Sequence, residues 1–451
     1  MRELRTALLL ALTLPGCGAP TPVHIASGCE RLDLDEGSCL LPWPSGQFLV
    51  DDPSTDTGRR ISLPADEMPM SFEMNTVSPA PWNARDGFSA MTSMVVRIEG
   101  QIDDAVLHSW RHTDLSLAEG SPTVLLDVTH LDAPVRVAHF AEIEPPDPMT
   151  PQTFTTLYVR PAARLEENHH YVVAVRGLIR AGARPRSSVT FAALRDSRLT
   201  DSAAAEARRS HFEQQVFAPL DRAGVVRDQL IVAWDFWTGT GPIQELLAMR
   251  DLAFAHVDDL HCMITDPNAT SPDPEVRAVE GLFEVPYFLD ANCATGQRLS
   301  DLQTTGLSRD AAGAPTQHGT CLARFEALIP RSVSAAAPRS VPLIEYGHGL
   351  GNSIHEIAEP GVVTPVLQAT GSIGITTDAL GLSEAGTDTL AIVDGLRDLS
   401  QFSAVDARVM QGVIAQVVLP HVFAHACAAL PELGVDSVVD ASRRDRSAKP
   451  G

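Results

Sequence analysis

Residues 341–351, Val-Pro-Leu-Ile-Glu-Tyr-Gly-His-Gly-Leu-Gly, carry residue types suited to stabilising a developing negative charge. An apolar run typical of a strand ends at a His-Gly turn, and a helix-like segment follows. Glycines in such a turn leave backbone N–H groups accessible, without side chains in the way. We therefore expect Gly347, His348, Gly349 and Leu350 to form an oxyanion loop for acyl-transfer chemistry. From the residues alone, His348 could in principle also act as a general base.

A nucleophile to match this loop is missing from the sequence. The usual serine elbow, Gly-x-Ser-x-Gly, occurs nowhere in the 451 residues. Serines that follow a glycine by two positions are Ser89, Ser308, Ser353 and Ser383. Ser383 comes closest to an elbow because Ala385 is small, whereas Ser353 is better explained as a helix N-cap. None of the four has a glycine two residues after it as well, so the sequence predicts no elbow nucleophile.

Candidate metal sites are incomplete as well. His421 and His425 lie at i and i+4, which can place two ligands on one helical face, but the Glu of zinc proteases is missing. His169 and His170 are adjacent in a predicted strand, so their side chains point to opposite faces. Residues 52–58 loosely resemble a calcium loop without its bidentate Glu, and a polar turn is preferred. We expect no metal and no cofactor.

The N-terminus has the features of a secretory signal. Arg2 and Arg5 precede an apolar run at residues 7–14, which is too short to span a bilayer. Leu-Pro-Gly-Cys17 then resembles a lipobox, whose cysteine is acylated. We expect an exported lipoprotein of the cell envelope, anchored to the membrane through Cys17. The alternative is a plain signal peptide with an incidental cysteine.

Six further cysteines, an even number in an exported chain, indicate disulfides. They are Cys29, Cys39, Cys262, Cys293, Cys321 and Cys427. Cys29 and Cys39 are expected to pair because they are close in sequence and flank a polar loop. Cys262, Cys293 and Cys321 are expected to supply one more pair, for which Cys293–Cys321 is a candidate. Cys427 is interpreted as free.

The net charge of −23 argues against binding to nucleic acid or to anionic lipid head groups. The chain is long enough for two or three domains. Short apolar runs bounded by turn residues predict strands at residues 94–98, 123–128, 155–159, 171–175 and 189–193. This pattern is typical of a β-sandwich and resembles bacterial Ig-like modules.

Helices and strands alternate in the rest of the chain. Periodicity predicts helices at residues 200–221, 243–254, 356–369 and 402–419. Apolar runs predict strands at residues 229–237, 283–288, 325–329, 341–346 and 373–377. Pro360 and Pro365 should kink or split the third helix. The strand-helix-strand-helix order from residue 341 onward favours a parallel sheet.

Several stretches in order resemble the secreted bacterial α/β-hydrolase lipoproteins related to extracellular lipases. They are Cys39-Leu-Leu-Pro-Trp-Pro-Ser, Pro81-Trp-Asn-Ala-Arg-Asp-Gly-Phe-Ser, Arg160-Pro-Ala-Ala-Arg-Leu, Ala233-Trp-Asp-Phe-Trp-Thr, Tyr346-Gly-His-Gly-Leu-Gly, Thr377-Asp-Ala-Leu-Gly-Leu-Ser and Asp406-Ala-Arg-Val-Met-Gln-Gly. The resemblance covers about residues 29–444. It implies a fold of the α/β plus all-β class, in which an N-terminal Ig-like β-sandwich precedes an α/β-hydrolase domain. It also implies cleavage of a small ester or lipid, with residues 347–350 as the oxyanion loop. In that loop His348 matters for its backbone and not as a general base.

The sequence departs from this family at two places. Ala379 stands where the family has a Trp, and residues 445–451 do not continue into the expected strand and elbow. In the family the catalytic acid and histidine follow the nucleophile along the chain, so the resemblance implies that all three members of the triad are absent. We therefore expect an incomplete α/β-hydrolase domain that is inactive as written, with no catalytic residue. The alternative is a non-catalytic surface lipoprotein that binds or supports other molecules through its Ig-like domain.

The predicted organisation has four parts. They are a lipoprotein signal peptide at residues 1–17, a tether and disulfide loop at 18–75, an Ig-like β domain with a trailing helix at 76–240, and a partial α/β-hydrolase domain at 241–451.

Overall fold

The computed structural model describes residues 21–26, 39–145, 153–271, 273–311, 313–335, 340–359, 361, 363–435 and 439. Cys17 and Cys29 lie outside the described residues. The chain divides into two compact units. The first comprises the residues up to Gln47 together with Ala90–Thr238, and the second comprises Phe48–Ser89 together with the residues from Gly239 onward. Residues 48–89, which the sequence analysis assigned to the tether and the β domain, thus belong to the second unit.

The described part of the first unit contains two antiparallel sheets. One has the order β3 (Met94–Glu99), β7 (Phe154–Pro161), β6 (His139–Ile143). The other has the order β5 (Val135–Arg136), β4 (Thr123–Asp127), β8 (His170–Arg176), β9 (Leu230–Trp237). Side chains of β3 alternate between buried and half-buried, whereas every side chain of β8 is buried. The second sheet is therefore covered on both faces, and the predicted antiparallel β structure is confirmed.

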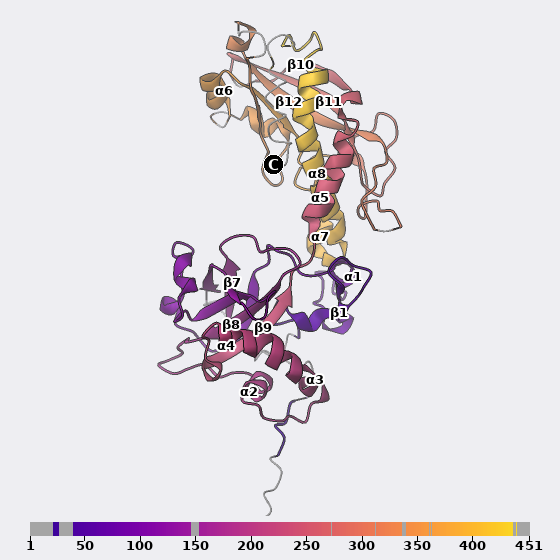
Figure 1. Ribbon diagram of the computed structural model, residues 1–451. Helices are drawn as coiled ribbons and strands as arrows, with labels where there is room; N and C mark the ends of the chain where they lie inside the picture. Colours follow the sequence, from indigo (N-terminus) through magenta and orange to yellow (C-terminus); the bar gives the residue numbers. More distant parts are fainter. Residues whose placement is uncertain are drawn as a thin grey trace, which may run out of the picture. The chain divides into compact units, whose positions relative to one another are not determined.

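Three α-helices lie between β8 and β9 in the chain of the first unit. They are α2 (Val189–Arg195), α3 (Ala203–His211) and α4 (Ala218–Arg222), with a π-helical segment, Phe212–Phe217, between the last two. Figure 1 shows them on the side of β8 and β9 away from β7. The strand predicted at residues 189–193 is wrong, because the Ser188 side chain accepts the N–H of Phe191 at 3.1 Å and caps a helix there. The helix predicted over residues 200–221 is confirmed.

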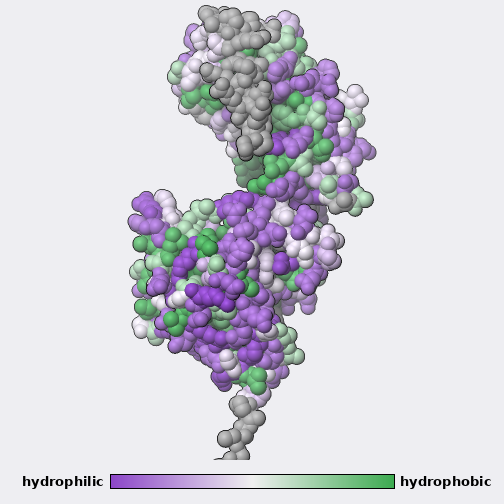
Figure 2. Space-filling model, viewed as in Figure 1, coloured by the Kyte–Doolittle hydropathy of each residue, from purple (hydrophilic) through white to green (hydrophobic). Residues whose placement is uncertain are grey.

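The surface of the first unit agrees with the strong net charge. On the face seen in Figure 2, hydrophilic residues cover most of this unit, and apolar residues are scattered among them. Scattered apolar side chains are normal on protein surfaces and need no special explanation.

The described strands of the second unit form a five-stranded sheet and a small two-stranded one. The larger sheet has the order β10 (Cys262–Ala269), β11 (Val276–Pro286), β12 (Thr320–Pro330), β14 (Ile373–Thr377), β13 (Leu343–Glu345). The smaller sheet pairs β1 (Leu49–Asp51) with β2 (Arg59–Ile61). In the larger sheet only β13 and β14 are parallel. Val341, two residues before β13, also forms an isolated parallel bridge with Val439. The parallel pairing predicted after residue 341 is thereby confirmed.

Helices cover both faces of this sheet. Those that pack on it are α5 (Pro242–Phe254), α6 (Thr364–Thr370) and α8 (Phe402–Val422). Two further helices of this unit lie elsewhere, since α7 (Asp388–Arg397) packs against α8 and α1 (Ala80–Asn83) lies beside β2. On one face α8 packs against β11 and β14, with α5 beside it (Figure 1). On the other face lie α6 and the 3-10 helix Ile354–Ala358, where Ile357 and Leu367 pack against Ala278 and Leu328. The helix predicted over residues 356–369 is split, as its prolines indicated.

The segment Leu399–Cys427 is long and apolar enough to cross a membrane by length and composition alone, and it is the one such helix among the described residues. In the structure α8 buries Ile414, Val418 and Leu419 in the core of the second unit. A core helix buried between a sheet and another helix needs the same composition. The apolar character of this segment is therefore explained by its packing.

Disulfides tie the second unit together. Cys262–Cys427 joins β10 to the segment after α8, and Cys293–Cys321 closes the loop between β11 and β12. The candidate pair Cys293–Cys321 is confirmed, and the interpretation of Cys427 as free is wrong. Cys39 is also disulfide-bonded, and its expected partner lies outside the described residues. A helical pattern in sequence gives no information on what faces Cys427, and the opposite cysteine comes from a strand that the sequence analysis missed.

Candidate functional site

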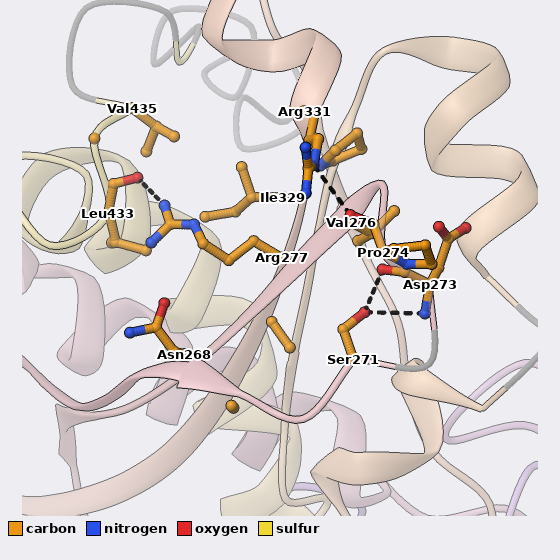
Figure 3. Close-up of a pocket in the computed structure, with 14 residues that line it drawn as sticks. Asn268, Ser271, Asp273, Pro274, Val276, Arg277, Ile329, Arg331, Leu433 and Val435 are labelled. Carbon is orange, nitrogen blue, oxygen red and sulfur yellow. Dashed lines mark hydrogen bonds between the residues drawn. The ribbon is translucent and has the colours of Figure 1, made fainter.

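A pocket of about 620 Å³ lies at the amino ends of the parallel strands (Figure 3). Its position follows from the register, because Leu328 pairs with Gly374 near the start of β14 and the pocket lies beyond that point. Arg277 crosses it and donates to the backbone carbonyls of Glu432 and Leu433, at 2.8 and 2.5 Å. Ligands of open α/β sheets bind at the carboxyl ends of the strands. We therefore place the candidate site at the opposite edge.

The predicted oxyanion loop lies at that edge, directly after β13. The N–H of Gly349 donates to a carboxylate oxygen of Glu356 at 2.9 Å. Within the described residues, the N–H groups of Gly347 and Leu350 have no hydrogen-bond partner, and the Leu350 side chain is exposed. The loop thus has two backbone donors without partners among the described residues. The N–H of Gly349, which was expected to be a free donor, is instead bonded to the carboxylate of Glu356.

His348 fixes this loop to the one that follows β14. Its buried ring accepts the N–H of Ala379 at Nε2, at 2.8 Å. An acceptor nitrogen carries no proton, so the proton is on Nδ1, which donates to the Gly349 carbonyl at 2.8 Å. Both ring nitrogens are therefore used, and His348 positions the loop. The interpretation that it is no general base agrees with this geometry, and Ala379 takes part through its backbone.

Glycine is required by the backbone at Gly351 and not earlier in the loop. Gly351 has φ +75°, a conformation that side chains rarely adopt. A Cβ added at Gly347 or Gly349 would meet its nearest neighbours at 3.6 or 3.7 Å, an ordinary contact distance. Gly347 and Gly349 are therefore not required by the course of the backbone. Their effect is to leave the neighbouring backbone N–H groups uncovered by side chains.

Of the four serines that follow a glycine by two positions, Ser383 and Ser353 are not built to act as nucleophiles. Ser383 is buried, and its hydroxyl accepts the N–H of Ala385 at 2.9 Å while donating to Asp378 at 3.4 Å. No histidine contacts it within the described part of the chain. Ser353 lies at the predicted N-cap position of a 3-10 helix, but its side chain makes no capping hydrogen bond.

Side chains of α8 hold the loops around this edge. Arg408 is buried and donates to the carboxylate of Asp388 at 2.5 Å. The other oxygen of Asp388 accepts the N–H groups of Gly381 and Ser383, at 2.6 and 2.9 Å. The motif that begins at Asp406 thus anchors the loop after β14. Sequence reasoning missed Asp388, because its segment was not predicted as a helix.

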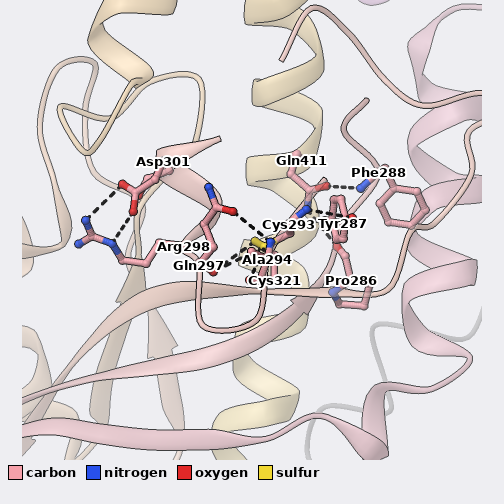
Figure 4. The surroundings of a disulfide bond; sticks show 11 residues. Pro286, Tyr287, Phe288, Cys293, Ala294, Gln297, Arg298, Asp301, Cys321 and Gln411 are labelled. Carbon is pink, nitrogen blue, oxygen red and sulfur yellow. Dashed lines mark hydrogen bonds and ion pairs between the residues drawn. A yellow bond between two sulfur atoms is a disulfide. The ribbon is translucent and has the colours of Figure 1, made fainter. Parts of the chain in front are cut away.

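Gln411, in the same motif, holds the end of β11 (Figure 4). Its buried side chain accepts the N–H of Phe288 at 2.8 Å and donates to the Pro286 carbonyl at 3.1 Å. These bonds lie beside the loop closed by Cys293–Cys321. Both ends of the Gln411 amide are thus engaged with the backbone, which makes its role structural.

Three groups with metal-ligand chemistry meet on the sheet face beneath the 3-10 helix. They are Glu280 of β11, Glu326 of β12 and His355, and their ligand atoms all lie within 4.8 Å of one another. His355 Nδ1 is 3.2 Å from Glu326 and 3.7 Å from Glu280. Burial raises the pKa of Glu326 to about 7, although His355 opposes the shift. Sequence reasoning missed this cluster, and the available signal was a Glu in the middle of each apolar strand.

The adjacent histidines of the first unit bind separate carboxylates, as predicted. His169 Nδ1 is 2.6 Å from Asp127, whereas His170 Nε2 is 2.8 Å from Asp235. His211 Nε2 approaches the same oxygen of Asp235 at 2.8 Å. Burial alone would raise the pKa of Asp235, but the hydrogen bonds from both histidines outweigh it and leave this pKa lowered. The sequence analysis did not anticipate the role of His211.

The two other candidate metal sites from the sequence, the His421–His425 pair and the turn at residues 52–58, make contacts within the protein. His421 Nε2 lies 2.7 Å from the exposed carboxylate of Asp258, and its ring is 4.3 Å from that of His425. In the turn at residues 52–58, Asp52 accepts from Arg60 Nε at 2.5 Å. The carboxylate that a calcium ion would need is thus paired with a guanidinium.

Comparisons with known proteins do not assign this chain to a family, so its function is interpreted from the geometry of the structure. No protein-family model, no curated protein and no solved structure matches this chain.

Proposed function

We propose that the second unit is related to the α/β-hydrolase domains of ester-cleaving enzymes, and that these 451 residues do not hydrolyse esters by themselves. One observation carries the proposal. The loop after β13 is held by His348 against the loop after β14 and presents the N–H groups of Gly347 and Leu350 without partners in the described chain. In α/β-hydrolases, one oxyanion donor comes from a strand-to-helix loop at this position.

The topology supports the same proposal. The parallel strands β13 and β14 are each followed by a helical segment, and Val439 bridges in parallel to Val341. The chain after α8 thus returns to the sheet in the direction of β13. In an α/β-hydrolase, the strand that ends in the nucleophile elbow follows this part of the fold.

The expectation of inactivity rests on Ser383, the serine that comes closest to the elbow pattern. Ser383 is buried and bonded on both sides, and no histidine contacts it among the described residues. Backbone donors without a nucleophile give at most a residual acceleration of about 10³–10⁴-fold over water, and that requires a bound substrate. A small carboxylic ester or lipid is the substrate class that the complete site would take.

The coding DNA beyond codon 451 provides the decisive test. Translated in all three frames, it should contain a Gly-x-Ser-x-Gly followed by an Asp and a His. If no frame contains such an elbow, the hydrolase proposal fails. The function should then be sought in the first unit, as a binding or structural surface protein.

Hydrolysis of p-nitrophenyl butyrate tests the claim of inactivity. The chain should release no more p-nitrophenol than the matched variants Ser383→Ala and Ser353→Ala. Turnover that disappears in Ser383→Ala but survives in Ser353→Ala would contradict this claim and identify the nucleophile.

The sequence also supports a place for the protein in the cell envelope. The lipobox-like Leu-Pro-Gly-Cys17 after a short apolar run supports anchoring through acyl chains. Labelling of the expressed protein with a radioactive fatty acid should be lost in Cys17→Ala and kept in Cys39→Ala. The two antiparallel sheets of the first unit support an Ig-like module, to which the helices α2 to α4 are added.

A further inference from the structure

We propose that Glu280, Glu326 and His355 form a binding site for a divalent transition-metal ion, for which Zn²⁺ is the probe. The site lies on the sheet of the second unit, on the face covered by the 3-10 helix Ile354–Ala358. The proposal does not depend on the hydrolase assignment, because it rests on ligand geometry alone.

The register of the sheet brings the two carboxylates together. Glu280 and Glu326 are direct partners across the β11–β12 ladder, so their side chains leave the sheet on the same face at the closest spacing that a sheet provides. Like charges in this position destabilise a sheet unless a cation lies between them. His355, carried by the 3-10 helix above, places Nδ1 near both. All ligand atoms lie within 4.8 Å of one another, so small side-chain adjustments would bring them to one ion.

An independent observation also points to a ligand here. Thr376 is fully buried, and its hydroxyl has no hydrogen-bond partner in the described part of the chain. It is the register partner of Glu326 on the next strand, β14, so its side chain lies on the same face beside that carboxylate. A buried hydroxyl without a partner is costly. An ion held by Glu326, or a water on that ion, would supply the missing partner.

The surroundings favour a cation. A cavity of about 470 Å³ opens beside the three residues and is also lined by Asp266 and Glu359, with no Lys or Arg among its lining residues. The nearest guanidinium on the same strand is that of Arg324, which is engaged in two hydrogen bonds to Asp378, at 2.7 and 3.0 Å. Its hydrogen bonds are therefore directed to Asp378, and its influence on Glu280 is only electrostatic. The His355 side chain is 55% exposed, which leaves a path for an ion to enter.

The donor set selects the class of ion. Two carboxylates with one imidazole and room for water suit Zn²⁺ and similar transition metals. Ca²⁺ and Mg²⁺ prefer sites built from oxygen alone. The sequence analysis considered the pair His421 and His425 for metal, whereas the geometry assigns the ion to residues from three separate segments.

The site is joined to the candidate oxyanion loop through consecutive residues. His355 contacts the carboxylates, while the next residue, Glu356, accepts from the N–H of Gly349 and from the hydroxyl of Tyr346 at 2.6 Å. An ion on His355 would therefore fix the helix that occupies the Gly349 donor. The loop should become more rigid when the metal binds.

The test is isothermal titration of Zn²⁺ into the full chain, expressed without a histidine tag and treated with EDTA. We expect one Zn²⁺ per chain. Both Glu326→Gln, which preserves shape, and His355→Ala, at an exposed position that leaves the core intact, should weaken binding at least tenfold. Zn²⁺ should raise the melting temperature of the wild-type chain and leave that of His355→Ala unchanged.

Matched controls use other histidines of the same unit. His261 is exposed and bonded to Glu284 at 2.8 Å, and His421 belongs to the helical pair, so His261→Ala and His421→Ala should bind as wild type. Three outcomes would overturn the proposal. They are an absence of Zn²⁺ binding, binding that is lost in His421→Ala but kept in His355→Ala, and Ca²⁺ binding as tight as Zn²⁺ binding.

Discussion

Glu280 and Glu326 face each other directly across the β11–β12 ladder, and Glu326 is almost completely buried. Burial raises the pKa of Glu326 to about 7 from 4.5. A raised pKa means that the protonated carboxyl of Glu326 stabilises the fold relative to the unfolded chain. This contribution to the free energy of unfolding is complete below about pH 4.5 and is lost as the pH rises through about 7. In EDTA-treated protein, Glu326→Gln should therefore be more stable than wild type at pH 8, by about 1–2 kcal/mol, and no more stable at pH 5. Urea unfolding at the two pH values measures this difference.

Glu284→Gln is the matched control for this prediction. Glu284 lies on the same strand as Glu280 and accepts from the exposed His261. Its replacement should change stability by less than about 0.5 kcal/mol at either pH. A Glu326→Gln variant that is less stable than wild type at pH 8 would show that the carboxylate is stabilised as an anion without metal.

Asp235 should make the first unit sensitive to acid. Its carboxylate is buried and receives hydrogen bonds from His170 and His211, which lower its pKa despite burial. A lowered pKa stabilises the folded chain above the unfolded value of about 3.9, and this stability is lost as the pH falls further. Asp235→Asn should cost about 3 kcal/mol at neutral pH, because it breaks a buried charged cluster. The difference from wild type should shrink below about pH 4.

Fluorescence of the tryptophans near this cluster gives the measurement, since Trp237 stacks on His170 at 3.7 Å. Asp127→Asn, at the more exposed partner of His169, should cost less. If the two variants lose equal stability at neutral pH, the buried cluster has no special role.

The buried Arg408–Asp388 ion pair should be far more sensitive to the loss of one partner than an ion pair on the surface, as measured by the free energy of unfolding. Arg408 is 1% exposed and Asp388 is fully buried, so Arg408→Gln leaves an uncompensated carboxylate and should cost about 3–5 kcal/mol. Arg397 pairs with Glu73 at 3.1 Å, and both side chains are about half exposed. Arg397→Gln should therefore cost at most about 1 kcal/mol. Guanidinium unfolding of both variants checks the ratio, and similar losses would contradict the argument.

Elements with a clear sequence period were predicted well. The runs that became β3, β8 and β14 start or end within a residue or two of the structure, because β-branched residues bounded by turns are informative locally. The run at residues 189–193 also contains β-branched residues, but the Ser188 cap determined its structure. Local propensity did not reveal that cap, because the capping residue lies outside the apolar run.

The candidate site was only partly predictable for a different reason. The loop of residues 347–350 is contiguous, so a motif could identify it. The cluster of Glu280, Glu326 and His355 depends on the register of β11 against β12 and on a helix that folds back over both. A single sequence contains no information on register between strands that are 46 positions apart, as 280 and 326 are. Pairing of Cys427 failed for the same reason, since its partner lies on β10.

The two disulfides of the second unit should differ in their contribution to stability. Cys262 and Cys427 are 165 positions apart, whereas Cys293 and Cys321 are 28 apart. In the chain-entropy model a longer loop restricts the unfolded chain more, which gives about 5 kcal/mol for the first pair and about 3.5 kcal/mol for the second. The double variant Cys262→Ala/Cys427→Ala should therefore have the lower free energy of unfolding. Urea titration of both double variants, without reductant, measures this ranking. The opposite ranking would mean that packing around Cys293–Cys321, where Gln411 holds the end of β11, outweighs the entropy of the longer loop.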